Sequence, residues 1–101
     1  MPKTKTAQPA LNQNPHRVSE KREKVLEVAI GREVRAFRRQ KNMMVAELAQ
    51  QTGLSIGMLS KIENGITSPS LTTLQTLANA LSVPLTAFFR RFEENRGVVH
   101  V

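Results

Sequence analysis

Apolar residues recur at helical spacing along most of the chain. In the first apolar segment, steps of four, four and three separate Leu26, Ile30, Val34 and Phe37. Residues at this spacing share one face of a helix, which we predict over about 21–41. Asn42 tolerates the left-handed conformation in which helices often end, so it is the expected terminus.

Two short helices are predicted next, on either side of a glycine. The first of them ends at Gly53 and has as its apolar residues Val45, Leu48 and Ala49. Ser55 is a favourable N-cap for the other, which we place at about 55–64. The pair Asn64-Gly65 terminates that helix.

Two further helices complete the pattern. Ser70 caps a fourth helix, in which helical spacing relates Leu71, Leu74, Leu77, Ala78 and Leu81. Pro84 suits the opening turn of a fifth helix. This helix contains Phe88 and Phe89, and Phe92 follows it. We interpret the three aromatic residues as core or as a dimer contact. Short loops between five helices predict an all-α fold, a compact five-helix bundle.

The two ends of the chain differ from this pattern. Residues 1–19 contain three prolines and hardly any large apolar side chain, so we expect a disordered basic arm there. The helical domain is assigned to 20–91. The tail, 92–101, ends in a strand-like run, GVVHV. One strand alone is not stable, so this run is either a frayed end or the start of a β-rich domain.

Charge narrows the class of partner. The 101 residues suffice for one domain, and 15 Lys and Arg against eight Glu give a formal net charge of +7. This surplus favours a polyanion, either nucleic acid or an anionic membrane surface, although charge alone does not choose between them. The sequence has no cysteine, no apolar stretch long enough to cross a membrane and no signal-peptide pattern, so we expect a soluble cytoplasmic protein without a membrane partner.

Catalytic chemistry is not indicated. Cysteine and aspartate are absent, and the only histidines, His16 and His100, fall in the two ends. The sequence also has neither a glycine-rich phosphate loop nor a HExxH motif. We therefore predict no enzyme activity, no metal site and no cofactor.

The two short helices around Gly53 have the layout of a helix-turn-helix, a unit that many small helical proteins contain without binding DNA. The residues favour a more specific interpretation. Five runs carry it: VAELAQQTGLS at 45–55, LSKIENG at 59–65, TSPSL at 67–71, LANAL at 77–81 and VPL at 83–85. Together they resemble the Cro and lambda-repressor (XRE) family of helix-turn-helix regulators.

The resemblance implies that the helix at 55–64 lies in the major groove of double-stranded DNA. Its groove-facing residues would be Ser55, Ile56, Gly57, Ser60 and Lys61. Contacts to the DNA backbone would come from Val45, Asn64, Thr67 and Ser68. It also implies a structural salt bridge between Arg38 and Glu63, with a solvated Glu63 or a phosphate-binding Arg38 as alternatives.

The chemistry of the groove-facing set is uneven. Lys61 can donate to guanine, and Ile56 can pack on a thymine methyl group. Gly57 lowers helix propensity by about 1 kcal/mol, which fits either a close approach to DNA or a neutral position. Ser60 suits either a base or a phosphate. Since no Arg, Gln or Asn stands among these five, shape and phosphate contacts are expected to supply much of the affinity.

Two residues depart from the family pattern. Met44 stands where the family places Ser or Thr, so the helix after it loses part of its N-cap, worth about 1 kcal/mol. Val45 stands where related domains often carry Gln, so only its backbone amide can reach a phosphate. The other cations of the first helix are interpreted most simply as a solvated face, with steering of DNA by some of them as an alternative: Arg32, Arg35, Arg39 and Lys41.

The sequence therefore predicts a DNA-binding transcriptional regulator, expected to act as a repressor and as a homodimer on two half-sites about 34 Å apart or a multiple of that. The runs at 67–74 and 84–89 are similar to regulators that join this domain to a cupin-type sensor. A small-molecule effector is expected only if such a sensor domain exists. Two alternatives stay open: an antitoxin that represses its own operon, and an adaptor that binds proteins without reading bases.

Overall fold

A computed structural model describes the backbone of residues 15–90 and the side chains from Lys24 to Arg90. Within these residues the regular structure is all helical and contains no strand. The elements are four α-helices and one 3₁₀-helix: α2 (Pro15–Gln40), α3 (Val45–Thr52), α4 (Ile56–Glu63), α5 (Leu71–Leu81) and η1 (Leu85–Phe89). The predicted all-α class is confirmed, and the count of five α-helices is corrected below.

Helix α2 begins earlier than the sequence indicated. It starts at Pro15 and not near residue 21, so the stretch 15–19 of the predicted disordered arm is helical. Proline is favourable at a first helical position, and no glycine or proline interrupts 16–24. Once a helix is nucleated, each added residue gains a hydrogen bond, so α2 extends through a stretch whose one large aliphatic side chain is Val18. The rest of the predicted arm, 1–14, and the tail 92–101 lie outside the described residues.

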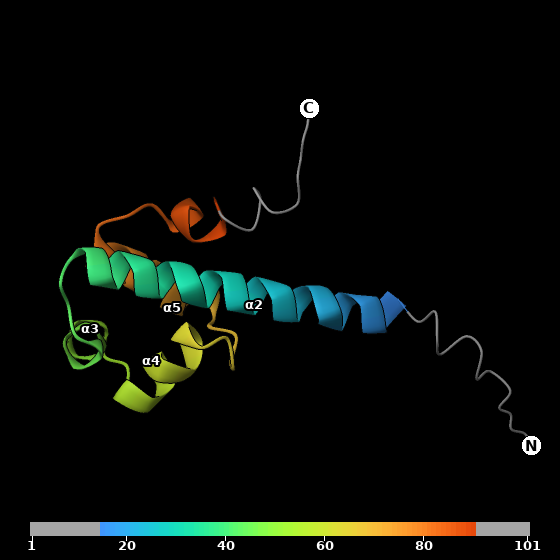
Figure 1. The fold of residues 1–101 in the computed structure, drawn as a ribbon, viewed down its shortest axis with the longest axis horizontal. Coiled ribbons are helices and arrows are strands. Elements are labelled where there is room, and N and C mark those ends of the chain that lie inside the picture. Colours follow the sequence, from blue (N-terminus) through green and yellow to red (C-terminus); the bar gives the residue numbers. More distant parts are fainter. Residues whose placement is uncertain (1–14, 91–101) are drawn as a thin grey trace, which may run out of the picture.

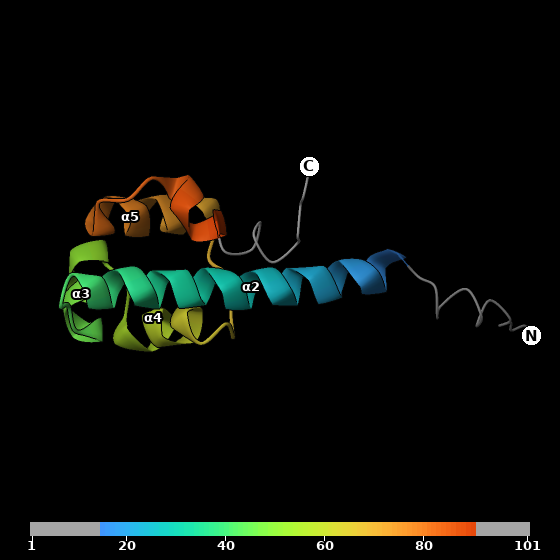
Figure 2. The ribbon, with the colours of Figure 1, turned by 45° about the horizontal axis from the view of Figure 1, so that its top comes forward.

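The long α2 is the element around which the others pack. Its 26 residues span about 39 Å. Helices α3 and α4 lie along one side of its C-terminal half, whereas α5 and η1 cover another side (Figures 1 and 2). The N-terminal part of α2 extends beyond all of them (Figure 1). The C-terminal half of α2 therefore belongs to the core.

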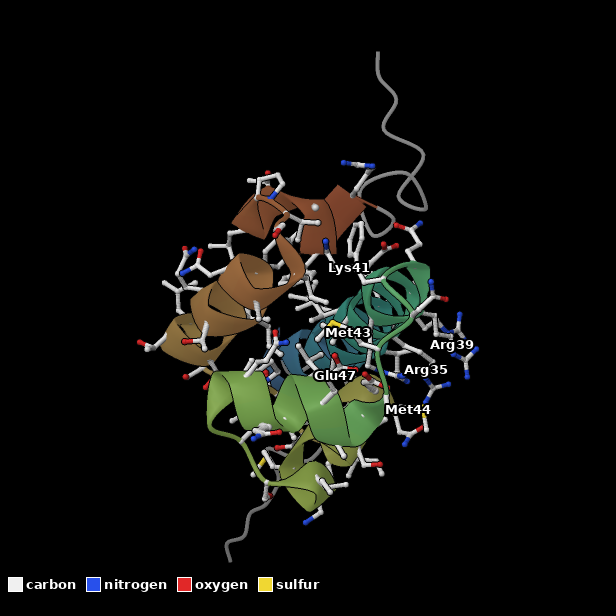
Figure 3. The ribbon with its side chains drawn as sticks, turned by 90° about the vertical axis from the view of Figure 1, so that its left-hand side faces the viewer. Arg35, Arg39, Lys41, Met43, Met44 and Glu47 are labelled. Carbon is white, nitrogen blue, oxygen red and sulfur yellow. The ribbon has the colours of Figure 1, made fainter. Side chains whose placement is uncertain are left out.

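The turn between α2 and α3 directs the side chains of two adjacent methionines to opposite sides. Asn42 ends α2 with a positive φ of 58°, as its residue type predicts. Met43 then points into the protein and is buried, whereas Met44 points outward with 72% of its surface exposed (Figure 3). Met43 thus anchors the start of α3 to the core.

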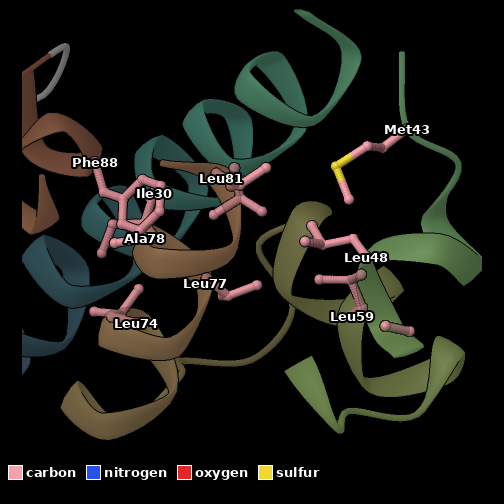
Figure 4. Close-up of a cluster of buried hydrophobic side chains, with 11 residues drawn as sticks. Ile30, Met43, Leu48, Leu59, Leu74, Leu77, Ala78, Leu81 and Phe88 are labelled. Carbon is pink, nitrogen blue, oxygen red and sulfur yellow. The ribbon is translucent and has the colours of Figure 1, made fainter. Parts of the chain in front are cut away.

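A single apolar cluster joins all five elements (Figure 4). The largest fully buried side chains of the described residues are Val34, Leu48, Leu59, Ile62, Leu77, Leu81 and Phe88, and all but Ile62 belong to this cluster. The Phe88 ring also lies against Phe37, with 6.1 Å between ring centroids. Phe88 is therefore core, as expected, and Phe89 packs half-buried at its edge. Phe92 lies outside the described residues.

The predicted fifth α-helix is instead the 3₁₀-helix η1. Its first hydrogen bond runs from the Ala87 amide to the Pro84 carbonyl, at 2.9 Å, which is the i to i+3 pattern. The 3₁₀ form is typical of short helical segments, and Pro84 provides no side-chain cap to this one. Burial of Ala87 and Phe88 holds the segment in place.

Candidate nucleic-acid interface

Helices α3 and α4 form a helix-turn-helix. Gly53 ends α3 with a φ of 77°, a left-handed conformation that glycine adopts without a steric penalty. The Leu54 amide then donates to the Ala49 carbonyl at 3.1 Å, which closes the turn. Both helices bury one face, because Leu48 and Ala49 in α3 and the apolar residues of α4 enter the core. Packing, and not helix propensity, fixes the angle between two helices this short.

Helix α4 turns one face inward and one outward. Its buried face consists of Leu59, Ile62 and Glu63. Its exposed residues, together with its two caps, are Ser55, Ile56, Gly57, Met58, Lys61 and Asn64, and Ser60 is half-buried between the two faces. The Ser55 hydroxyl accepts a hydrogen bond from the Met58 amide at 3.0 Å, so the serine caps α4 as its residue type predicts. The side chains predicted to face DNA thus share an accessible surface.

The start of α3 carries the departure expected at Met44. This residue occupies the N-cap position with extended backbone, and its side chain makes no capping hydrogen bond. The first amides of α3 therefore have no side-chain acceptor, and the partial positive charge of the helix end faces outward. Val45 is half-buried; in the loop after α4, Thr67 is half-buried and Ser68 is exposed.

A buried ion pair fixes the C-terminal end of α4 to α2. The Arg38 guanidinium donates from Nε to Glu63 Oε2 at 2.7 Å and from Nη2 to Glu63 Oε1 at 2.9 Å. Its remaining Nη1 donates to the Met43 carbonyl at 2.8 Å. Arg38 is 8% exposed and Glu63 5%, so this is a desolvated pair with a bidentate geometry. The hydrogen bonds to Glu63 raise the pKa of Arg38, and burial opposes that shift. The expected salt bridge is present.

Arg35 belongs to the same network, which the sequence did not indicate. Its Nη2 donates to Asn64 Oδ1 at 2.7 Å, and its Nε lies 3.5 Å from Glu63 Oε1. The Asn64 amide group in turn donates to the Ser60 carbonyl at 2.8 Å. Arg35 is therefore not only part of a solvated face: it holds the residue that ends α4.

Further along α2, three more residues meet the end of α4. The Lys24 ammonium donates to the Gly65 carbonyl at 2.8 Å. A Cβ on Gly65 would lie 2.8 Å from a methyl carbon of Val28, and one on Gly31 would lie 2.3 Å from the Ile62 carbonyl oxygen. Only glycine lets these backbones approach so closely. A glycine inside a long helix is the sequence signal that could have predicted this contact.

Two further properties of the described residues concern metal ions and membranes. Among residues 24–90 no group of three or more His, Asp or Glu side chains is placed to bind a metal ion. Across the helices of the described chain, none is long and apolar enough to cross a membrane. The main chemical feature of these residues is the exposed face of α4 with the two helix ends beside it.

Comparison with known proteins agrees with this geometry. The HTH_3 family, described as "Helix-turn-helix", matches residues 34–88, more than half of the chain. The chain belongs to this helix-turn-helix family. The predicted resemblance to Cro and lambda-repressor-type regulators is thereby confirmed at the level of the family. The matched region begins inside α2, so the N-terminal part of that helix lies outside it.

Three curated relatives are similar to the chain over its central region. The HTH-type transcriptional regulator SlrR of Bacillus subtilis is 41% identical over 61 residues, which is 59% of this chain and 40% of the relative. The HTH-type transcriptional regulator SutR of Escherichia coli is 36% identical over 54% of this chain and 31% of its own length. The immunity repressor protein of Bacillus phage phi105 is 32% identical over 59% and 42%. The chain thus spans well under half the length of these relatives.

Solved structures share the fold. An HTH_3 family transcriptional regulator from Vibrio cholerae superposes with a TM-score of 0.66 and 29% identity, over 72% of this chain and 41% of that one. The restriction-modification controller protein C.AhdI from Aeromonas hydrophila superposes with a TM-score of 0.61 and 28% identity, over 62% and 96%. The arrangement of helices described above is therefore that of regulators with known structures.

Proposed function

We propose that this chain binds double-stranded DNA sequence-specifically, with α4 in the major groove, and that it regulates transcription as a repressor. One observation carries the proposal: α4 exposes its leading side chains while its far end is fixed to α2 through Glu63 and Asn64. A short helix can read base edges only if its orientation is fixed, and these contacts supply that constraint.

The five residues expected to face the groove each have a role in this proposal. Lys61 donates to guanine O6 or N7, and Ile56, 55% exposed, packs on a thymine methyl group. A Cβ on Gly57 would meet nothing within 4 Å, so no other part of the chain requires a glycine there. The missing side chain would instead let DNA approach the backbone closely. Ser55 and Ser60 supply small hydroxyl groups at the same surface.

The DNA backbone would be bound on both sides of this surface. The uncapped amide of Val45, at the start of α3, is a donor for one phosphate. Asn64, Thr67 and Ser68 lie at and after the end of α4 and would contact phosphates on the other side of this surface. A formal net charge of +7 supports such binding, because each neutralised phosphate releases bound counterions.

We further propose that the protein acts as a homodimer. Helix α4 has eight residues and offers no Arg or Gln for bidentate base contacts, so one copy can distinguish few base pairs. Two copies on half-sites about 34 Å apart would double the sequence that is read. The name of the phage relative, an immunity repressor, favours repression over activation. A small-molecule effector would act only through a separate sensor domain.

Selection of bound duplexes from a random pool tests the proposal. The selected duplex and a scrambled version are then titrated at several salt concentrations. A sequence reader retains its preference as salt weakens the electrostatic term, whereas a protein adaptor binds both duplexes equally at every salt concentration. Equal binding would contradict the proposal.

One substitution sharpens this test. Lys61→Ala should relax the preference at one base position by about 1–3 kcal/mol, because a base-specific donor is lost. Lys41→Ala is the matched control, since Lys41 is exposed and points away from α4 (Figure 3). Uniform weakening on all duplexes by Lys61→Ala would show that the lysine contacts only phosphate.

A further inference from the structure

Three arginines lie along one side of α2. Arg32, Arg35 and Arg39 follow one another at steps of three and four, which places them on neighbouring positions of one helix face. Arg32 and Arg39 are exposed, and the side chain of neither makes a hydrogen bond or ion pair with another residue in the described part of the chain. Arg35, between them, is held by Asn64. Two guanidinium groups are thus free on either side of one that is engaged.

This arginine face borders both helix ends that are proposed to contact phosphates. The 2.7 Å hydrogen bond from Arg35 to Asn64 brings it against the end of α4. Arg35, Arg39 and Met44 lie on the same side of the molecule, next to the uncapped start of α3, while Lys41 points toward η1 (Figure 3). Two residues turn a helix by about 200°, so the sequence spacing directs Arg39 and Lys41 to nearly opposite sides.

We propose that Arg32 and Arg39 bind phosphates of the DNA backbone beside the segment that α4 reads. The proposal rests on the proposed function and extends the DNA-binding surface onto α2. The guanidinium group suits this partner, because its planar set of donors matches phosphate oxygens. The two residues are about 10 Å apart along α2, whereas each DNA strand carries one charge per 3.4 Å or so of the duplex axis, so they reach separate phosphates.

Arg35 has a different part in this surface. Its Nη2 and Nε are directed at Asn64 and Glu63, so it acts as a positioning residue for the end of α4. Arg32 is the more informative member of the pair, because it precedes the region matched by the helix-turn-helix family. Its contact would be a property of the extended α2 of this chain.

The experiment compares two double variants of the full chain that carry the same charge. Arg32→Ala/Arg39→Ala and Lys41→Ala/Arg90→Ala each remove two of the +7 formal charges, leaving +5. All four side chains are exposed, so both variants should melt with the wild type. Affinities for the selected and the scrambled duplex are measured by fluorescence anisotropy between about 50 and about 200 mM salt.

The arginine variant should show a shallower salt dependence. Each lost phosphate contact lowers the slope of log K against log salt by about 0.9, so over this range the wild type should weaken roughly 12-fold more than the arginine variant. The loss of affinity should be equal on both duplexes, because phosphate contacts carry no sequence information. The lysine–arginine control should keep the wild-type slope.

The outcomes separate this proposal from the function on which it rests. If the selected duplex is still preferred but the arginine variant keeps the slope of the control, Arg32 and Arg39 face solvent or an acidic protein partner, and this proposal is overturned. If the wild type prefers no duplex at all, the proposed function itself fails, and the arginine contacts fail with it.

Discussion

Removal of Glu63 tests whether the buried ion pair stabilises the fold. Glu63→Ala would leave the Arg38 guanidinium buried with one remaining partner, the Met43 carbonyl. Because both side chains are almost fully desolvated, the loss should be about 3–5 kcal/mol. In a domain of this size each kcal/mol lowers Tm by about 4–8 °C, so Tm should fall by at least about 12 °C. Circular dichroism at the helical band gives Tm, and urea titration gives the free energy of unfolding.

A double variant serves as the control for this test. Arg38→Met/Glu63→Leu removes both charges and fills the space with apolar groups, so it should recover much of the lost stability. The raised pKa of Arg38 determines the pH range in which the ion pair can be tested. Because the pKa is raised on folding, the stabilisation by the charged Arg38 is complete below the ordinary pKa of arginine and is lost only as the pH rises through the raised pKa. Arg38 therefore stays charged at neutral pH, where the variants are compared. If Glu63→Ala melts within a few degrees of the wild type, the pair does not hold α4 in place.

Further substitutions test the close contacts and caps of α2, α3 and α4. Gly31→Ala should lower Tm despite its better helix propensity, because its Cβ would lie 2.3 Å from the Ile62 carbonyl oxygen; an increase would show that α4 can shift freely. Gly57→Ala meets nothing within 4 Å and should gain up to about 1 kcal/mol by urea titration while weakening DNA binding; unweakened binding would place Gly57 away from DNA. Met44→Ser should add about 1 kcal/mol by supplying the missing cap, and Ser55→Ala should lose about as much; effects of the same sign would refute the capping argument.

The local elements were largely predictable because their signals lie next to one another in the chain. Ser55 and Ser70 cap α4 and α5 where their residue types suggested, and Gly53 ends α3. The start of α2 was missed because polar sequence was equated with disorder, although propagation of an existing helix needs no apolar face. The fifth helix was assigned the wrong type, since five residues with apolar spacing fit a 3₁₀-helix equally well.

Contacts between distant parts of the chain were harder to predict. The pairing of Arg35 with Asn64 depends on how α2 crosses α4, which single-sequence spacing does not give. The same holds for the contact of Gly31 with Ile62. The salt bridge between Arg38 and Glu63 could be predicted from the family resemblance, although its bidentate geometry could not. The outward face of α4 followed from Leu59 and Ile62, whose burial leaves the opposite side accessible.

The most direct test of the account is a map of backbone amide chemical shifts as the selected duplex is added to the isotope-labelled 101-residue chain. The account predicts the largest changes from Ser55 to Asn64, with a second group at Val45 and Ala46, and little change across α5 and η1. Changes concentrated on α5 and η1, or none on α4 at saturating duplex, would contradict it.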